Sequence, residues 1–239
     1  MEEEFIITEP PELNVSEIEK IIGMKIKDPQ FYRKAFTHKS ALKRYTLTES
    51  FETLEFMGDS VLGFVITKFL FDRYEEMQEG FLTKARTKLV RGETLSGIAR
   101  KLGLDSLVLM DDKGIRNGWN NNDKILEDVF EALVGAIYMD LGLLNAKKFV
   151  LNLFENPAYV DMECIMIDDN YKDQLMRLCQ TNRWGLPEYK NEQIESVFHV
   201  NVVVTNTFIA SGTGKNKKQA EQDAAKNMLA ILKGLGYVI

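Results

Sequence analysis

The 239-residue chain has few cysteine, histidine and proline residues, and these shortages exclude several classes of protein. Its two cysteines, Cys164 and Cys179, cannot form a four-thiolate metal site or the dense disulfide framework of a small secreted domain. No apolar run reaches the roughly 18 residues that a membrane span requires. The first residues are acidic, unlike those of a signal or transit peptide. We therefore expect a cytoplasmic protein in a reducing compartment, with no membrane contact.

An overall excess of basic charge is also absent, since the net charge is −6. The charge is nevertheless uneven, because residues 169–239 have a net charge of +2 and residues 1–168 a net charge of −8. This asymmetry favours an acidic body joined to a mildly basic module. Ordinary sampling scatter explains it equally well, so charge alone does not decide between them.

Hydrophobic periodicity divides the chain into two domains. An acidic tail, residues 1–12, precedes a domain of residues 13–156 in which the pattern is helical almost throughout. The expected helices are Val15–Ile22, Pro29–Thr37, Phe51–Tyr74, Glu79–Leu102, Asp123–Met139 and Leu144–Phe154. Residues 157–168 mix proline, acidic and apolar residues, which is typical of a linker.

Residues 169–237 differ in character and predict a second domain in the order α-β-β-β-α. Phe198, Val200, Val202 and Val204 alternate with other residues, as in a strand with one buried face. The other expected elements are helix Tyr171–Thr181, strands Pro187–Gln193 and Phe208–Ser211, and helix Asn216–Lys233. One stripe of that last helix is apolar: Ala220, Ala224, Met228, Ile231 and Leu232.

Two of the predicted helices carry acidic residues on an otherwise apolar surface. Glu52, Glu55 and Asp59 are spaced three and four residues apart, so they share one stripe of their helix. Asp128 and Glu131 are three residues apart on the second helix. Helices that are apolar on nearly every other side are buried, and an uncompensated ionised carboxylate there costs several kcal/mol.

Cations that could compensate these carboxylates are missing from the same stretches. Neither Lys nor Arg occurs between Arg44 and Lys68 or between Lys124 and Lys147. Small residues beside the acids allow the two helices to approach closely: Gly58, Gly63, Ala132, Gly135 and Ala136. A hard divalent cation with oxygen ligands, such as Mg²⁺, supplies the missing charge and can activate water for phosphodiester hydrolysis. Spacing alone leaves two alternatives open, a solvated acidic groove and pairing with Lys or Arg of distant helices.

Four short segments make the acidic pattern more specific. In chain order they are residues 37–40 (THKS), 51–62 (FETLEFMGDSVL), 89–95 (LVRGETL) and 125–136 (ILEDVFEALVGA). With the residues from Tyr171 onward, they closely resemble the ribonuclease III family in sequence and in order. The resemblance covers nearly the whole chain after its first dozen residues.

This resemblance implies an all-α endonuclease domain followed by an α+β double-stranded RNA-binding domain. It implies hydrolysis of double-stranded RNA with Mg²⁺, or with Mn²⁺ as a substitute, leaving 5′-phosphate and 3′-hydroxyl ends with short 3′ overhangs. Processing of RNA and degradation of duplex RNA are equally compatible with it. It also implies a homodimer with one catalytic centre in each subunit.

The same resemblance assigns roles to individual residues of the acidic helices. Glu55, Asp59, Asp128 and Glu131 match the family's catalytic, metal-binding positions. Glu55 and Glu131 are the strongest candidates for direct ligands. Glu52 matches a further acidic position of secondary importance to the metal.

Two other residues of these segments have competing interpretations. Phe56 matches an aromatic residue that enters the partner subunit, whereas the helix pattern alone favours a place in the core of its own subunit. His38 is a conceivable general base, but the resemblance and its neighbour Lys39 favour a structural role.

Basic residues supply candidate contacts to RNA phosphates in both domains. Lys84, Lys88 and Arg91 share one face of the expected helix Glu79–Leu102, although a solvated helix face explains two of the three equally well. Residues 212–225 resemble the closing motif of double-stranded RNA-binding domains. In that motif Lys215, Lys217 and Lys218 adjoin Asn216, which can cap a helix whose N-terminus attracts phosphate.

The second domain departs from the family's pattern in two places. The loop between its first two strands, around Gln193–Ser196, is short and lacks the usual Gly, Pro and His. Its first helix has Asp173 and Met176 where polar side chains that contact RNA are common. We therefore expect residues 169–239 to bind duplex RNA weakly and with strong salt dependence.

Two other functions fit part of the pattern. A protein of this scaffold that sequesters duplexes without cutting them gains nothing from uncompensated carboxylates, so the acidic residues disfavour it. An unrelated helical metalloenzyme is disfavoured by the second domain.

Overall fold

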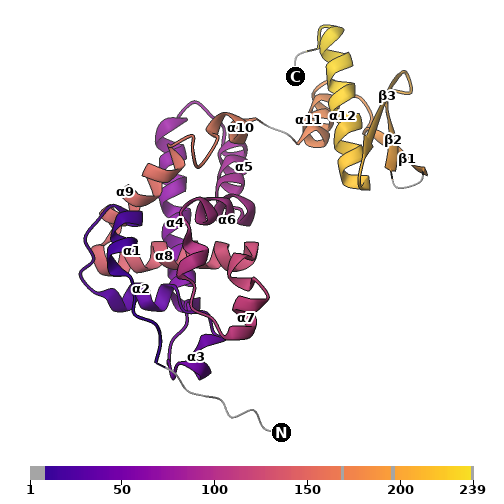
Figure 1. Cartoon of the computed structure of the whole chain (residues 1–239). Helices are drawn as coiled ribbons and strands as arrows, with labels where there is room; N and C mark the ends of the chain where they lie inside the picture. The colour runs from indigo at the N-terminus through magenta and orange to yellow at the C-terminus, as the bar shows by residue number, and fades with distance from the viewer. Residues whose placement is uncertain (1–8, 168–169, 195–196, 238–239) are drawn as a thin grey trace. The chain divides into compact units, whose positions relative to one another are not determined.

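The computed structural model describes residues 9–167, 170–194 and 197–237. These residues form two compact units, of which the first ends at Ile167. Figure 1 shows helices throughout the first unit and a three-stranded sheet with helices in the second. The predicted fold, an all-α domain followed by an α-β-β-β-α domain, is confirmed.

Three of the helices of the first unit, both long and short, begin at a capping side chain. The side chains of Asn14, Asp28 and Asn122 accept hydrogen bonds from amides of the first turns of α1, α2 and α8. Its α-helices are α1 (Val15–Ile22), α2 (Pro29–Ala35), α3 (Ala41–Arg44), α4 (Glu52–Arg73), α5 (Glu79–Leu89), α6 (Gly92–Lys101), α7 (Asp112–Arg116), α8 (Asp123–Leu141), α9 (Leu143–Phe154) and α10 (Met162–Met166). Two 3-10 turns, η1 (Leu104–Leu107) and η2 (Trp119–Asn121), lie between α6 and α8.

Helix α8 is the centre of the first unit, and α4 packs closely against it. Every residue of α8 from Val129 to Ile137 is buried. A Cβ atom added to Gly58 would lie 1.7 Å from the carbonyl oxygen of Glu131, and one added to Gly135 would lie 2.2 Å from that of Leu54. The predicted close approach of the two acidic helices is therefore confirmed at these two glycines. Gly63 takes no part, because nothing lies within 4 Å of the position of its missing Cβ.

The prediction of a single helix over Glu79–Leu102 is wrong, because the structure has two helices there, α5 and α6, separated by Val90 and Arg91. Arg91 has an extended backbone (ψ 151°) and is the N-cap of α6, which begins at Gly92. Gly92 packs against α8, since a Cβ added to it would lie 2.6 Å from Oε2 of Glu127. Glycine is a weak helix former. Its packing against Glu127 of α8 accompanies the change of chain direction between α5 and α6. The other predicted helices of this unit agree with the structure to within two residues at each end.

The segment 157–167, for which the sequence predicts a linker, is packed onto the first unit. Val160 is only 4% exposed and belongs to the hydrophobic core of that unit. The ammonium of Lys101 donates to the carbonyl oxygens of Ala158 (2.7 Å) and Tyr159 (3.2 Å), and Lys88 donates to that of Ile167 (2.6 Å). The compact first unit thus extends eleven residues beyond residue 156.

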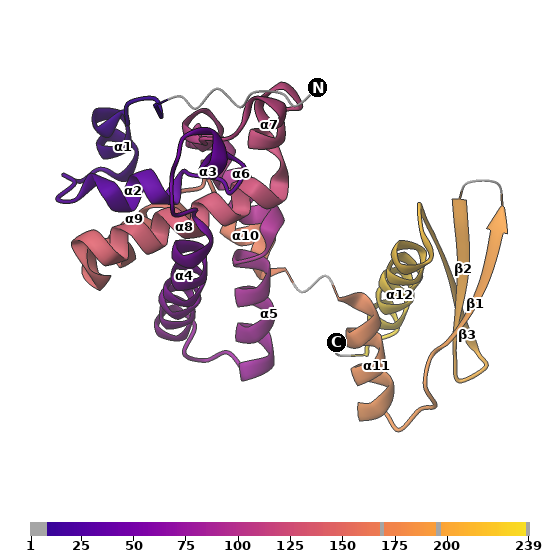
Figure 2. The same ribbon diagram turned by 90° about the horizontal axis from the view of Figure 1, so that it is seen from below.

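The second unit consists of one antiparallel sheet covered on one face by two helices (Figure 2). Its elements are α11 (Tyr171–Thr181), β1 (Glu188–Ile194), β2 (Val197–Val204), β3 (Phe208–Gly214) and α12 (Lys217–Gly234), with strand order β1-β2-β3. Val200, Val202 and Val204 are buried against the helices, as their alternation predicts. On α12 the predicted apolar stripe is wrong at Ile231, which is exposed, whereas Leu229 is buried. Residues 195 and 196 of the predicted short loop lie outside the described residues.

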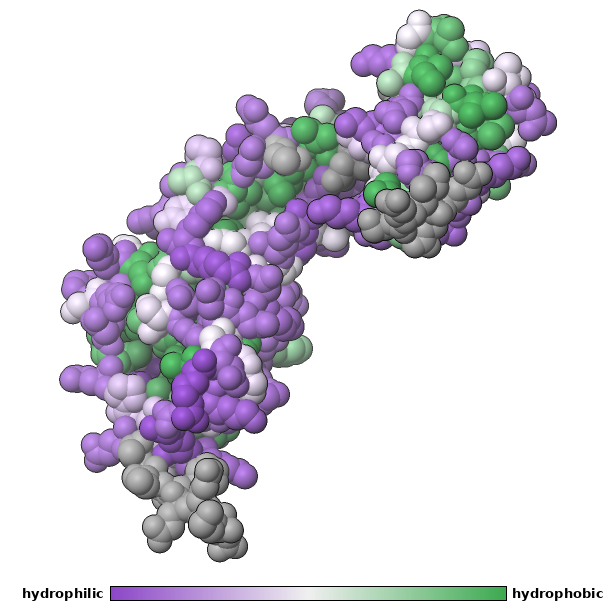
Figure 3. Space-filling model, turned by 45° about the vertical axis from the view of Figure 1, so that its right-hand side comes forward, coloured by the Kyte–Doolittle hydropathy of each residue, from purple (hydrophilic) through white to green (hydrophobic). Residues whose placement is uncertain are grey.

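Most of the surface visible in Figure 3 is hydrophilic, with smaller hydrophobic areas on each unit. Within the described part of the chain, no helix combines the length and the apolar character needed to traverse a lipid bilayer.

Candidate metal centre and RNA-binding elements

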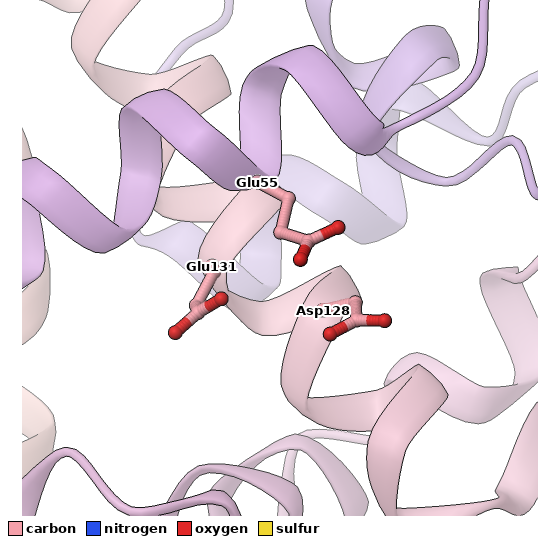
Figure 4. Close-up of side chains that lie close together, drawn as sticks. All are labelled: Glu55, Asp128 and Glu131. Carbon is pink, nitrogen blue, oxygen red and sulfur yellow. The ribbon is translucent and has the colours of Figure 1, made fainter.

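Three carboxylates from two helices meet beside the crossing of α4 and α8. Glu55 of α4 and Asp128 and Glu131 of α8 each offer an oxygen, and these oxygens lie within 4.8 Å of one another. Figure 4 shows the three side chains directed toward a common space beside the two helices. Their convergence depends on the close helix packing at Gly58 and Gly135. We call these three residues the acid triplet.

Burial and mutual repulsion make the acid triplet unfavourable for negative charge. Glu131 is only 8% exposed, and desolvation, with a smaller contribution from Asp59, raises its pKa to about 8. Desolvation also raises the pKa of Glu55, and the neighbouring charge of Asp128 adds to this effect. A bound cation would reverse both effects, because it stabilises the ionised carboxylates.

A cation lies next to the triplet, at the edge of the stretch without Lys or Arg. Lys124 approaches Asp128 with its Nζ 2.7 Å from Oδ1, and its charge acts to lower the pKa of both Glu55 and Glu131. The spacing of four residues on one helix is typical of such a pair. Lys124 is therefore the charged partner of the buried Oδ1 of Asp128.

The triplet has the chemistry of a site for a hard divalent cation. Its donors are all carboxylate oxygens, which Mg²⁺ and Mn²⁺ prefer to nitrogen or sulfur. The pKa values of Glu55 and Glu131 stay raised even with Lys124 nearby, which is a further sign that the protein alone leaves the site short of positive charge. The residues present therefore fit the metal that the sequence predicts.

Two other predicted acidic residues lie outside the triplet. Asp59 is exposed one turn after Glu55 on α4, yet its charge contributes to raising the pKa of Glu131. Glu52 is exposed, accepts a hydrogen bond from the hydroxyl of Ser50 and forms an ion pair with Lys39 (3.4 Å). Both residues affect the site electrostatically, since Asp59 acts to raise the pKa of Glu131 and Glu52 that of Glu55.

Glu127 is an acidic neighbour of the triplet that does not belong to the residues predicted from the sequence. Its Oε2 lies 3.4 Å from Nζ of Lys124, and its charge contributes to raising the pKa of both Glu55 and Glu131. Its position four residues before Glu131 and three after Lys124 on α8 puts it beside both by helical spacing alone. The packing of α8 against Gly92 of α6 adds a tertiary contact to its carboxylate.

His38 has the contacts of a structural residue. Its Nδ1 accepts a hydrogen bond from the amide of Ser40 (3.1 Å), and its ring packs against Phe51. Burial, together with the charge of Lys39, lowers the pKa of His38, so the ring is neutral with its proton on Nε2. These contacts join the loop after α2 to the start of α4 and support the structural interpretation.

Phe56 is 75% exposed, which contradicts a place in the core of its own subunit. Phe64 and Phe71 of the same helix are also largely exposed. Their spacings of eight and seven residues put the three rings along one side of α4. The prediction that α4 is buried on nearly every side is therefore wrong on this side, which forms an exposed phenylalanine stripe (Phe56, Phe64 and Phe71).

The three basic residues predicted to share one helical face do not do so. Lys84 and Lys88 lie on α5, whereas Arg91 lies beyond its end, at the N-cap of α6. Lys88 is half-buried and donates to the carbonyl oxygen of Ile167. Arg91 is exposed and forms an ion pair with Glu93 (3.3 Å).

The N-terminus of α12 has the predicted cap. The side chain of Asn216 accepts a hydrogen bond from the amide of Gln219 (2.9 Å). Lys215 precedes this cap, while Lys217 and Lys218 stand in the first turn, with Lys217 4.0 Å from Glu221. On α11, Asp173 forms an ion pair with Arg177 (3.2 Å), which reduces the negative charge predicted there.

Comparison with known proteins assigns both units. Residues 28–157 match the Ribonuclease-III-like family, and residues 171–232 match the double-stranded RNA binding motif. The nuclease domain of ribonuclease III from Campylobacter jejuni is similar in structure, with a TM-score of 0.56 and 35% identity over 59% of this chain and 94% of that domain. A second structure of that domain describes structural flexibility in a region involved in dimer formation.

Similar sequences extend over most of the chain. A putative protein of Paramecium bursaria Chlorella virus 1 is 42% identical over 88% of this chain and 76% of its own length. Ribonuclease 3 of Nitrosococcus oceani is 35% identical over 88% of this chain and 91% of its own length. Ribonuclease 3 of Francisella philomiragia is 35% identical over 92% of this chain and 96% of its own length. This chain therefore belongs to the ribonuclease III family of hydrolytic endoribonucleases specific for double-stranded RNA.

Proposed function

We propose that this protein cleaves double-stranded RNA with Mg²⁺ bound by Glu55, Asp128 and Glu131, leaving 5′-phosphate and 3′-hydroxyl ends with short 3′ overhangs. The observation that carries the proposal is the acid triplet, three carboxylates from α4 and α8 within 4.8 Å of one another. Mn²⁺ is expected to substitute for Mg²⁺, since both accept oxygen ligands. Asp59 acts beside the triplet by orienting water near the metal, and Glu52 has a secondary role.

The metal, when bound, supplies the positive charge that activates water and stabilises the leaving oxygen of the phosphodiester. The protein's own contribution is to hold three carboxylates ionised and close together. Glu131 must lose the proton that its raised pKa favours before it can bind the metal. The buried surroundings of Glu131 then strengthen its interaction with the cation, because the local dielectric constant is low.

We further propose that the exposed phenylalanine stripe of α4 forms the interface of a homodimer. Phe56 is 75% exposed, and exposed aromatic rings of this size are unusual on a monomer unless they meet a partner. Phe56 follows the triplet residue Glu55 directly, so a partner at this stripe would lie beside the catalytic site. The dimer would then present two such sites to one duplex.

For RNA binding, we propose that Lys215, Lys217 and Lys218 contact phosphates at the N-terminus of α12. The capped helix end adds exposed amides and a favourable dipole to these three charges. On the first unit, Arg91 is the preferred contact, with Lys84 as a secondary one. Lys88 is the weakest candidate, because its ammonium holds the backbone of Ile167.

The cleavage proposal is tested by incubating long duplex RNA with the wild type and with Glu131→Gln, with and without Mg²⁺. We expect only the wild type with Mg²⁺ to cut, while the variant keeps its affinity for the duplex. Glu76→Gln, which removes an exposed carboxylate of the same unit, is the matched control and should cut like the wild type. Equal cutting by the wild type and Glu131→Gln contradicts the assignment, and no cutting by either favours a protein that only sequesters duplexes.

A further inference from the structure

Lys124 lies between two carboxylates at the start of α8. Its Nζ is 2.7 Å from Oδ1 of Asp128 and 3.4 Å from Oε2 of Glu127. Within the described ranges, it is the only Lys or Arg side chain that forms an ion pair with a member of the acid triplet. Lys124 thus partly neutralises the carboxylate of Asp128.

Packing against α6 holds the side chain of Glu127 in this position. Its side chain is 21% exposed and packs over Gly92 in the first turn of α6. A Cβ at position 92 would lie 2.6 Å from Oε2 and 2.9 Å from Cδ of Glu127, so a larger residue there would displace the carboxylate. Arg91, the N-cap of α6, makes no side-chain hydrogen bond to the first turn, and the carboxylate of Glu127 lies beside Gly92 in that turn.

A divalent cation and the ammonium of Lys124 compete for the carboxylate of Asp128. Like charges repel, so a metal held by the acid triplet raises the energy of Lys124 at its present place. Removing the ammonium into solvent would forfeit its pairing with both carboxylates. Glu127 already lies within 3.4 Å and is not a member of the acid triplet, so it offers Lys124 a negative partner that the metal does not occupy.

We propose that Glu127 is the alternative partner of Lys124, to which the ammonium shifts when a divalent cation binds Asp128. This inference rests on the metal site proposed above and makes Glu127 a positioning residue that acts through Lys124. Glu127 thereby strengthens metal binding without ligating the metal. Lys124 in turn keeps the metal-free site partly neutralised.

A double-mutant cycle on the full chain tests the proposal, with Mn²⁺ binding measured by titration calorimetry in the absence of RNA. Lys124→Met removes the competing charge, and we expect it to tighten Mn²⁺ binding about tenfold. Glu127→Gln leaves Lys124 on Asp128, and we expect it to weaken binding about fivefold. In the double variant the effect of Glu127→Gln should fall to less than about twofold, because the residue it assists is gone.

The cycle separates this inference from the metal site itself. Glu127→Gln weakening Mn²⁺ binding equally with and without Lys124 would identify Glu127 as a ligand or a direct charge and overturn the proposal. Unchanged or weaker binding by Lys124→Met also overturns it. No binding by the wild type, or binding that Glu131→Gln leaves intact, refutes the metal site as well.

Matched controls exclude unspecific effects of charge. Glu93→Gln removes a carboxylate that also lies near Gly92, in the first turn of α6, but that pairs with Arg91 instead of Lys124. Lys113→Met removes an exposed lysine of α7. Both controls should bind Mn²⁺ within about twofold of the wild type, as expected for exposed charges. Circular dichroism of all variants shows whether each is folded.

Discussion

Replacing Glu131 by glutamine is expected to stabilise the metal-free protein at alkaline pH. In the folded protein the pKa of Glu131 rises from its ordinary value of 4.5 to about 8, chiefly because of burial. The folded state therefore holds a proton that the unfolded state releases, and stability falls as pH rises from about 4.5 to about 8. At about 1.4 kcal/mol per pH unit, the upper limit of this loss is about 4–5 kcal/mol.

Glutamine has nearly the same shape and carries no charge, so the variant avoids this loss. We expect equal stabilities at pH 4.5 and an advantage for Glu131→Gln that grows to about 3 kcal/mol at pH 9, allowing for relaxation around the site. Urea unfolding in the presence of EDTA, at one protein concentration and at intervals from pH 4.5 to 9, measures the difference directly. Titrating groups remote from Glu131 are common to both proteins and cancel.

Adding Mg²⁺ at pH 8 provides the complementary measurement. A cation that binds only the folded state stabilises the wild type in proportion to its occupancy, and Glu131→Gln should gain much less. The exposed Glu76→Gln serves as the control for loss of a carboxylate at the surface. A difference between wild type and Glu131→Gln that stays constant with pH, or that favours the wild type at pH 9, would refute the reasoning.

Three further predictions concern the helix packing, the dimer and the RNA contact. Gly58→Ala should lower the free energy of unfolding by about 3 kcal/mol or more, because its Cβ would lie 1.7 Å from a backbone oxygen. Urea unfolding measures this change, and Gly63→Ala, which adds a Cβ where nothing lies within 4 Å, is the control. Phe56→Ala should shift sedimentation equilibrium toward monomer by at least about tenfold in dissociation constant, and an unchanged equilibrium contradicts the interface. Joint replacement of Lys217 and Lys218 by glutamine should make the logarithm of the duplex-binding constant fall less steeply with the logarithm of salt concentration in filter-binding assays. The slope should decrease by the amount expected for about two phosphate contacts, and an unchanged slope excludes both residues.

Helix spacing identified the acidic residues, but it did not decide which of them meet. Glu52, Glu55 and Asp59 share one stripe of α4, yet only Glu55 joins Asp128 and Glu131 in the triplet. Glu55 is half-buried beside the crossing of α4 with α8 at Gly58, whereas Glu52 and Asp59 are exposed. The position of a crossing depends on both helices at once, and periodicity describes each helix separately.

Some features followed from the sequence alone because their causes are local. The cap at Asn216, the alternation along Val200, Val202 and Val204, and the small residues beside the acids each act over a few residues. Charge partners and exposure depended on the tertiary structure. Lys88 donates a hydrogen bond to the carbonyl oxygen of Ile167, which is 79 residues away in the sequence. Phe56 is exposed, but a phenylalanine has the same apolar character in the sequence whether it faces a core or solvent.

The carboxylates of the two acidic helices illustrate the division most clearly. The sequence determined that carboxylates occur on two largely apolar helices and that they match a hydrolytic family. Only the folded chain decided that Glu55 meets Asp128 and Glu131, that Glu127 packs over Gly92, and that Glu131 is the most deeply buried of the triplet. Electrostatic energies depend on distance and on the exclusion of water, and both are set by residues that are remote in the sequence.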